Sequence, residues 1–244
     1  NELYYNLSTI QLFILLALPC FFAATARGIQ PLDEPDTLTL IQISEPHICN
    51  LNGYHSSFVQ MRQHYGNNIE PFKIFLQSVP KENNVDCLII TGDNIDYYEA
   101  ESEQGWMLDT QIEQFAHLLN RSDIPIYLTL GNHDIASYWI NSDSVFSKGV
   151  HQLNSASARA VWIRNISCFK NNTYYSRVLK VDTTAFRLIF LDNGYYAAEE
   201  STESSLPFII EQSQLEWLDN QLKTSTSDVE ILFMHIPLPH GKFL

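Results

Sequence analysis

The stretch IPIYLTLGNHD, residues 124–134, joins an apolar run to a polar end. The run from Ile124 to Leu130 is rich in β-branched, aromatic and other apolar residues, as buried strands are. Gly131 ends the run, and an amide, an imidazole and a carboxylate follow at once, in Asn132, His133 and Asp134. An α/β sheet often delivers reactive groups to the loop beyond a strand in this way. The stretch therefore predicts a strand of an α/β sheet that leads into half of a metal site.

Three other strand-like runs also end at polar side chains. Residues 37–43 lead into Glu45 and His47, residues 85–91 into Asp93, and residues 229–234 into His235. The carboxyl ends of parallel strands meet at one edge of a sheet. We therefore expect the four runs to bring these groups to one edge of one sheet.

The segments between the first three runs have helical patterns. Apolar residues recur through residues 57–78, which predicts a helix or a pair of helices packed on the sheet. Residues 104–119 place apolar side chains mainly three and four positions apart, which predicts a second covering helix. The order is β-α-β-α-β, which implies parallel strands joined by right-handed crossovers.

The pattern changes after Asp134. We expect short helices at residues 144–154 and 156–163, and an antiparallel hairpin formed by residues 173–181 and 185–191. Ser213 and Glu216 have the spacing of a capping box, which predicts the start of a helix with three leucines on one face: Leu215, Leu218 and Leu222. The hairpin adds a second sheet or a mixed edge to the parallel one.

Composition limits the class of protein. The chain has 244 residues, 45% of them hydrophobic, which suits one α/β domain with a sizeable core. Its formal net charge is −14, and its lysines and arginines are scattered. Because no basic stripe is present, we exclude a nucleic-acid duplex as partner.

The first residues have the features of a secretory signal. Residues 3–26 contain no charged side chain and close with Ala24-Thr25-Ala26, a small-x-small pattern. We predict a signal peptide over residues 1–26 that is cleaved before Arg27, a linker over 27–36, and no membrane span in the mature chain. The protein would then be secreted, periplasmic or at the cell surface. The alternative is a surface scaffold anchored by this segment left uncut, since it is long enough to span a bilayer.

Three cysteines remain after cleavage: Cys49, Cys87 and Cys168. Their number is odd, and their spacing is not that of a metal site. In parallel neighbouring strands, Cys49 and Cys87 would lie at opposite ends and too far apart to bridge. We expect no structural disulfide framework.

The strand-end residues are suited to a pair of metal ions. Asp93 is a carboxylate that can bridge two cations, Asn132 offers a neutral oxygen, and His47 and His235 offer ring nitrogens. Such mixed nitrogen and oxygen sites favour Fe, Mn or Zn. Two such ions generate a hydroxide that attacks a phosphoryl group. His133 would then be the general acid that protonates the leaving oxygen, with Asp134 to orient its ring and stabilise its protonated form.

These segments resemble the calcineurin-like binuclear metallophosphoesterases. That family carries Asp-x-His, Gly-Asp, Gly-Asn-His-(Asp/Glu), a lone His after a later strand, and Gly-His-x-His. Here Glu45-Pro46-His47, Gly92-Asp93, Gly131 to Asp134 and His235 stand in the same order, and the resemblance covers residues 37–244. It implies a four-layer αββα sandwich of two mixed β-sheets flanked by helices. It also implies roles for six residues: Glu45 and His47 on the first metal, Asp93 as the bridge, Asn132 and His235 on the second metal, and His133 as the catalytic acid.

The sequence departs from the family pattern at two places. Glu45 stands where the family has Asp, which predicts a reshaped first metal position. No Gly-His-x-His follows His235, and the chain does not begin with Met, so we expect a fragment whose phosphoesterase domain is incomplete at its C-terminus.

The resemblance also bears on the reaction. Asp96 stands where purple acid phosphatases have a ligand Tyr, so the resemblance favours the phosphodiesterase branches. The expected function is hydrolysis of a phosphodiester or phosphomonoester in a small molecule, lipid or nucleotide. The alternative is a binding protein on the same fold that has lost catalysis, for which Glu45 is the internal support.

Overall fold

The computed structural model describes residues 37–83, 85–141, 146–149, 152–194 and 210–237. The predicted signal peptide and linker, residues 1–36, lie outside the described residues, as does the end of the predicted domain from residue 238 onward. Among the described residues, no helix combines the length and the apolar character that crossing a membrane requires.

The first sheet contains three parallel strands, which confirms the predicted β-α-β-α-β order. Strands β1 (Leu40–Ile43), β2 (Cys87–Thr91) and β5 (Ile126–Thr129) lie in the order β1-β2-β5. Every residue of β2 is buried, because this strand has a neighbour on each side and is covered on both faces. The sheet therefore lies between two layers of other elements.

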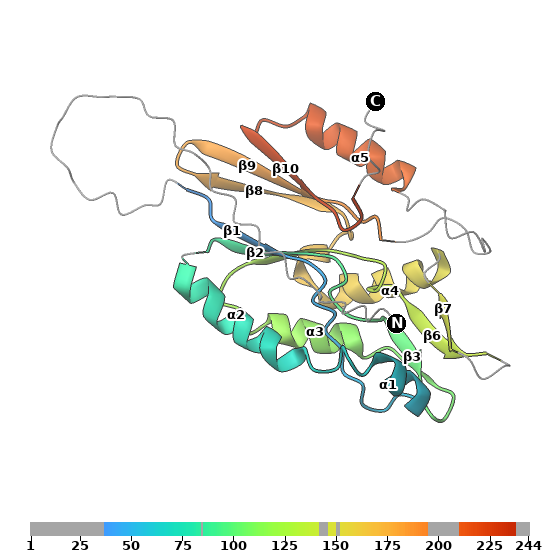
Figure 1. Ribbon diagram of the computed structural model, residues 1–244. Helices are drawn as coiled ribbons and strands as arrows, with labels where there is room; N and C mark the ends of the chain where they lie inside the picture. The colour runs from blue at the N-terminus through green and yellow to red at the C-terminus, as the bar shows by residue number, and fades with distance from the viewer. Residues whose placement is uncertain (1–36, 84, 142–145, 150–151, 195–209, 238–244) are drawn as a thin grey trace, which may run out of the picture.

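Two helices cover one face of this sheet (Figure 1), while a third, short helix lies near their ends. The segment predicted as a helix or a pair of helices contains α1 (Ser56–Arg62) and α2 (Ile69–Asn83), of which α2 covers the sheet and α1 is the short helix. The second covering helix is α3 (Gln111–Leu119). This last helix is shorter than predicted. The residues before it form a turn stabilised by the Ser102 hydroxyl, which accepts from the amide of Trp106 at 3.1 Å, and strand β4 (Met107–Leu108) follows. Trp106 is 69% exposed, so it is not part of the buried helix face that its apolar side chain suggested.

The second sheet confirms the predicted hairpin and completes the αββα layering (Figure 1). Strands β8 (Tyr175–Val181) and β9 (Thr184–Phe190) are antiparallel, and β10 (Val229–Phe233) pairs with β9 in parallel. Helix α5 (Gln212–Lys223) lies on the side of this sheet away from the first one.

The predicted capping box of α5 is wrong. The helix begins at Gln212, so Ser213 lies inside its first turn and makes no cap. Glu216 instead accepts from the side chain of Gln212 at 3.0 Å, which is an ordinary contact one turn apart. Of the predicted leucine face, Leu215 and Leu222 are exposed.

Aromatic side chains join the two sheets. The Tyr175 hydroxyl donates to the carbonyl oxygen of Leu128 and accepts from its amide, both at 3.0 Å, which ties β8 to the middle of β5. The ring of Phe190 stacks on those of Tyr175 and Phe233. The three cysteines in the described part of the chain are buried and free: Cys49, Cys87 and Cys168.

A small third sheet, which the sequence did not predict, lies beside the carboxyl end of the first. Its order is β4-β3-β6-β7, with β3 (Glu99–Glu101), β6 (Ser137–Ile140) and β7 (Phe146–Gly149). The helix predicted at residues 144–154 is therefore wrong in its first half. The helix predicted at residues 156–163 lies within α4 (Gln152–Asn165), which is followed by the short η1 (Ser167–Phe169). Strands of two to four residues are too short to show an alternating pattern.

Candidate metal centre

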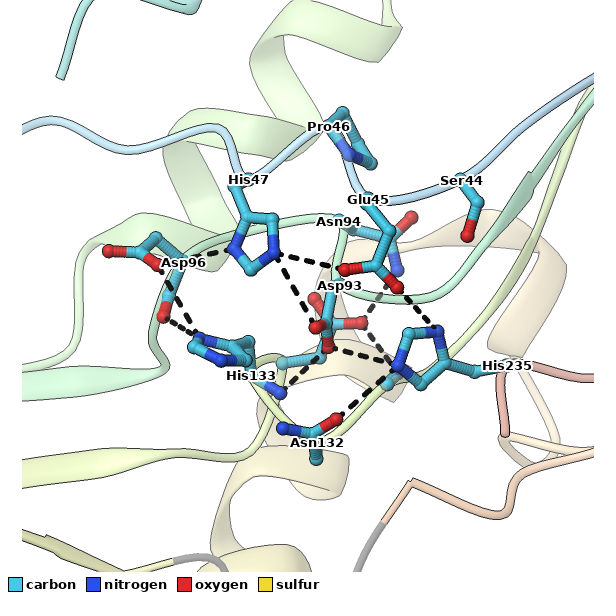
Figure 2. A network of polar contacts seen from close by, with 12 residues as sticks. Ser44, Glu45, Pro46, His47, Asp93, Asn94, Asp96, Asn132, His133 and His235 are labelled. Atoms are coloured by element: carbon cyan, nitrogen blue, oxygen red, sulfur yellow. Dashed lines mark hydrogen bonds and ion pairs between the residues drawn. The ribbon is translucent and has the colours of Figure 1, made fainter. Parts of the chain in front are cut away.

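The structure brings the predicted metal-binding residues together beyond the ends of four strands (Figure 2). Glu45 and His47 follow β1, Asp93 follows β2, and Asn132 and His133 follow β5. His235 follows β10, which belongs to the second sheet. The expectation of one edge of one sheet is therefore wrong for His235, although its ring reaches the same site. Two sheets, packed face to face, build this centre.

Two glycines leave the room that the His235 ring occupies. A Cβ atom on Gly92, whose φ is +78°, would overlap with the His235 ring. A Cβ atom on Gly131 would lie 2.9 Å from His235 Cδ2 and would overlap with the Asp93 carboxylate. The segment after His235 is held by Asn193, whose side chain donates to the carbonyl of Ile236 at 2.7 Å and accepts from its amide at 3.2 Å. The glycines that end β2 and β5 are thus needed for packing against the second sheet.

Three of the site residues have a strained backbone. Glu45, His47 and Asp93 have φ values of 59°, 43° and 48°, in the left-handed region. Each such residue costs about 1–2 kcal/mol. The amides of Glu45 and His47 hold this conformation by donating to the carbonyls of Gly92 and Asp93 at 3.2 and 3.0 Å. Strain of this kind persists where a site requires its geometry, so its clustering here supports a functional role.

We call Glu45, His47 and the Oδ2 atom of Asp93 the first half of the site. His47 Nε2 lies 3.1 Å from Glu45 Oε2 and 3.6 Å from Asp93 Oδ2. The side chains of His47 and Asp93 are 11% and 5% exposed, whereas that of Glu45 is 52% exposed. Glu45 is therefore the solvent-exposed member of the first half.

We call Asn132, His235 and the Oδ1 atom of Asp93 the second half. His235 Nε2 lies 3.3 Å from Asn132 Oδ1 and 3.5 Å from Asp93 Oδ1. The Asp93 Oδ1 atom also accepts from the amide of His133 at 2.8 Å, which fixes the plane of the carboxylate. The two oxygens of Asp93 therefore face two different histidines, as a bridging ligand requires.

The donor chemistry fits metal ions. Carboxylate and amide oxygens converge on the Nε2 atoms of two histidines, with Glu45 Oε2 at His47 and Asn132 Oδ1 at His235, and such a set of oxygen and nitrogen donors can hold a cation. Donors on one ion with bonds of roughly 2.1 Å lie roughly 3.0–3.4 Å apart. The separations in both halves, 3.1–3.6 Å, are close to this range.

The opposite nitrogen of each histidine has its own partner. His47 Nδ1 donates to Asp96 Oδ1 at 3.2 Å, and His235 Nδ1 donates to the carbonyl oxygen of Thr91 at 3.0 Å. Such partners fix the tautomer and the orientation of the ring, which leaves Nε2 as the donor to a metal. Both rings are thus prepared to bind through Nε2.

Asp96 is the site residue that the sequence analysis did not assign. Its carboxylate is fully buried and accepts from Arg62 Nε at 2.8 Å, with a second contact to Arg62 Nη2. It also lies 3.4 Å from His133 Nδ1, which donates to the Asp96 carbonyl oxygen at 2.8 Å. A signal was available, since Asp96 stands three residues after Asp93 in the same loop. Asp96 connects the first half of the site to His133.

The predicted role of Asp134 is wrong. Its carboxylate is fully buried and accepts from the amides of Ile95 and Gly131 at 3.0 and 2.8 Å and from the Asn94 side chain at 2.8 Å. These bonds join the loop after β2 to the loop after β5. Asp96, not Asp134, orients the His133 ring. The Gly-Asn-His-Asp motif ends in a structural carboxylate because a tight turn directs adjacent side chains to different sides.

Burial, hydrogen bonds and neighbouring charges displace the pKa values of His47, Asp96 and Asp134. Burial alone would lower the pKa of His47, but its hydrogen bonds to Asp96 and Glu45 and the charge of Asp93 raise it to about 9. Burial would raise the pKa of Asp96, but hydrogen bonds from His133, His47 and Arg62 hold it well below its usual range. Asp134 has neutral partners, so its burial and the charge of Asp93 raise its pKa. The negative potential around His47 is what a cation site requires.

Three comparisons relate the chain to known proteins. The sequence model of the calcineurin-like phosphoesterase family matches residues 38–243. Among solved structures, a dimetal phosphatase from Danio rerio is similar over 83% of this chain and 70% of its own, with 15% identity and a TM-score of 0.46. No curated protein matches the sequence.

Proposed function

Because the chain belongs to the calcineurin-like phosphoesterase family, we propose that it hydrolyses phosphate esters with two metal ions held by the two halves of the site. The observation that carries this proposal is the position of Asp93, whose two oxygens face the Nε2 atoms of His47 and His235. The mixed nitrogen and oxygen donors favour Fe, Mn or Zn. When bound, the ions neutralise charge on a phosphoryl group and make water a nucleophile near neutral pH.

His133 has the position of a general acid. Its Nδ1 atom is committed to the carbonyl of Asp96, so Nε2 is the nitrogen that exchanges a proton with substrate. The Asp96 carboxylate, 3.4 Å from Nδ1, stabilises the protonated ring. His133 would donate its Nε2 proton to the leaving oxygen of the ester. Arg62 holds Asp96 in place and is a positioning residue.

The proposal includes two finer expectations from the sequence. The substrate is a phosphomonoester or phosphodiester in a small molecule, lipid or nucleotide, and the protein is exported by its N-terminal signal.

The alternative of a binding protein without catalysis depended on Glu45 replacing Asp. Since Glu45 Oε2 lies 3.1 Å from His47 Nε2, the longer side chain still supplies a donor, and the structure gives the alternative no added support.

The first experiment tests metal dependence. The purified chain is treated with a chelator, reloaded with Mn²⁺, Zn²⁺ or Fe, and assayed on 4-nitrophenyl phosphate and bis(4-nitrophenyl) phosphate. We expect up to two ions per chain and hydrolysis only in the loaded protein. A protein that binds no metal and hydrolyses neither ester would contradict the proposal.

The second experiment tests the acid. His133→Ala should lower kcat by roughly 10²–10⁴-fold for an alkyl phosphate, whose leaving group needs a proton. The loss should be much smaller for 4-nitrophenyl phosphate, whose leaving group does not. His117→Ala, which changes an exposed histidine on α3, is the matched control. Equal losses for both esters would argue against the general-acid role.

A further inference from the structure

Lys148 projects from the third sheet to the centre of the site. It lies on β7 directly opposite Tyr138 of β6, and its Nζ atom is 5.8 Å from the centre of the Tyr138 ring. The same Nζ atom is 3.3 Å from His133 Nε2, the nitrogen that we assign to proton donation. Strand pairing and a cation–π contact thus place an ammonium group beside the position of the reacting ester.

Lys148 differs from the neighbouring cation of the site in the charges around it. The site contains three carboxylates, those of Glu45, Asp93 and Asp96, in a chain of net charge −14. The neighbouring cation, Arg62, is held by Asp96 through two contacts. For Lys148, in contrast, no carboxylate of the described chain lies within ion-pair distance. The surrounding protein atoms desolvate its ammonium group and lower its pKa, which the charge of Asp93 partly offsets. The partner that the described residues give it is the His133 ring nitrogen, not a carboxylate, so no ion pair neutralises its charge when an anion enters the site.

We propose that Lys148 binds a non-bridging oxygen of the substrate's phosphoryl group and gives the site a preference for phosphomonoesters over phosphodiesters. This inference rests on the proposed function, because it names a substrate class for the same site, and it departs from the phosphodiesterase branches that the sequence resemblance favours. A monoester phosphoryl group carries two negative charges near neutral pH and a diester group carries one. The Coulomb attraction to one ammonium group is therefore about twice as large for the monoester.

A structural role for Lys148 makes a different prediction. If the side chain only packed on Tyr138, a methionine of similar length would replace it, and all substrates would be affected alike. If the ammonium group binds the phosphoryl oxygen, the loss depends on the charge of the substrate, and arginine restores the function. The two roles can therefore be distinguished by comparing substrates that have the same leaving group and differ in charge.

The test compares Lys148→Met and Lys148→Arg in the metal-loaded protein. The substrates are 4-nitrophenyl phosphate and methyl 4-nitrophenyl phosphate, which share a leaving group and differ in charge. We expect Lys148→Met to lower kcat/KM at least about tenfold for the monoester and less than about threefold for the diester. Lys148→Arg should retain most of the monoester activity. Lys180→Met, at an exposed position on β8, is the matched control.

Phosphate binding supplies a readout that needs no turnover. Titration calorimetry with inorganic phosphate should give a Kd about tenfold higher for Lys148→Met than for the wild type or Lys180→Met. Equal losses on both esters, or no loss on either together with unchanged phosphate binding, would overturn the inference. Wild-type protein that hydrolyses neither ester would instead contradict the proposed function, while the phosphate titration would still decide the role of Lys148.

Discussion

The two halves of the site differ in charge and in origin. The first half combines the carboxylates of Glu45 and Asp93 with His47, whose ring is backed by the Asp96 carboxylate. The second half shares Asp93 and adds two neutral groups, the Asn132 amide and His235, while the Glu45 carboxylate reaches only the outer nitrogen of that ring, with Oε1 3.5 Å from Nδ1. The His235 ring is backed by a backbone carbonyl. Because a carboxylate behind a histidine raises the basicity of the ligand, the first half should hold its ion more tightly and favour the higher charge.

The origin of each half matters for stability. All residues of the first half follow strands of the first sheet, and their loops are joined by backbone hydrogen bonds. The second half needs His235 from the second sheet, held against Gly92 and Gly131. The first half therefore depends on local strain, whereas the second depends on the packing of two sheets. Substitutions can separate the two.

The largest effect is expected for Asp93→Asn, which changes the residue common to both halves. One carboxylate oxygen becomes an amide nitrogen that cannot bind a metal, and the negative charge is lost. We expect less than one ion per chain by elemental analysis, and loss of hydrolysis by at least about 10³-fold, since both the ions and their placement are affected. Asp123→Asn, an exposed position before β5, should keep the wild-type metal content.

The matched pair His47→Ala and His235→Ala tests the comparison directly. Each removes one imidazole and leaves the other half intact, so each should retain one ion. We expect the ion retained in His235→Ala to bind more tightly than the one retained in His47→Ala, because the first half has more charge. Competition with a chelating dye measures both affinities. Equal affinities would remove the proposed asymmetry.

The sequence predicted the site residues that follow strands of the first sheet better than it predicted the rest of the site. Glu45, His47, Asp93 and Asn132 each follow a strand with a clear apolar pattern, so parallel pairing alone brings them together. His235 also follows such a strand, but a pattern does not say which sheet a strand joins. Its position depends on side-chain packing between sheets, such as the stacking of Phe190 on Phe233.

The residues that the sequence did not assign correctly are those whose role depends on a turn or a short strand. Asp96 and Asp134 are both fully buried aspartates after a strand, yet one contacts charged and ring nitrogens while the other contacts neutral donors. Only the loop geometry distinguishes them. Lys148 lies on a four-residue strand with no sequence signal, so its proximity to His133 required the structure.

A smaller effect is expected for Asp96→Asn, which weakens the support of His47 without removing a ligand. Loss of a carboxylate behind a metal-binding histidine typically costs 10–100-fold in affinity. We expect this loss in the first half only, so the second half is an internal control. Calorimetric titration should therefore resolve two metal sites whose affinities differ less in the variant than in the wild type. An equal loss at both sites would show that Asp96 acts through the fold, for instance by releasing Arg62.

The smallest effect is expected for Glu45→Asp, for which two consequences have opposite signs. Aspartate adopts the left-handed backbone of position 45, φ 59°, more readily than glutamate, so the metal-free protein should become slightly more stable, by a few tenths of a kcal/mol. The carboxylate would retreat by roughly one bond length, about 1.5 Å, from its 3.1 Å contact with His47 Nε2, so the first half should bind its ion several-fold more weakly. Because Glu45 is the exposed ligand, the loss should stay below tenfold. Thermal unfolding with and without metal measures both effects. A rise in both metal affinity and turnover would mean instead that glutamate at position 45 weakens metal binding in the first half. The greater charge of the first half would then not be what distinguishes the two halves.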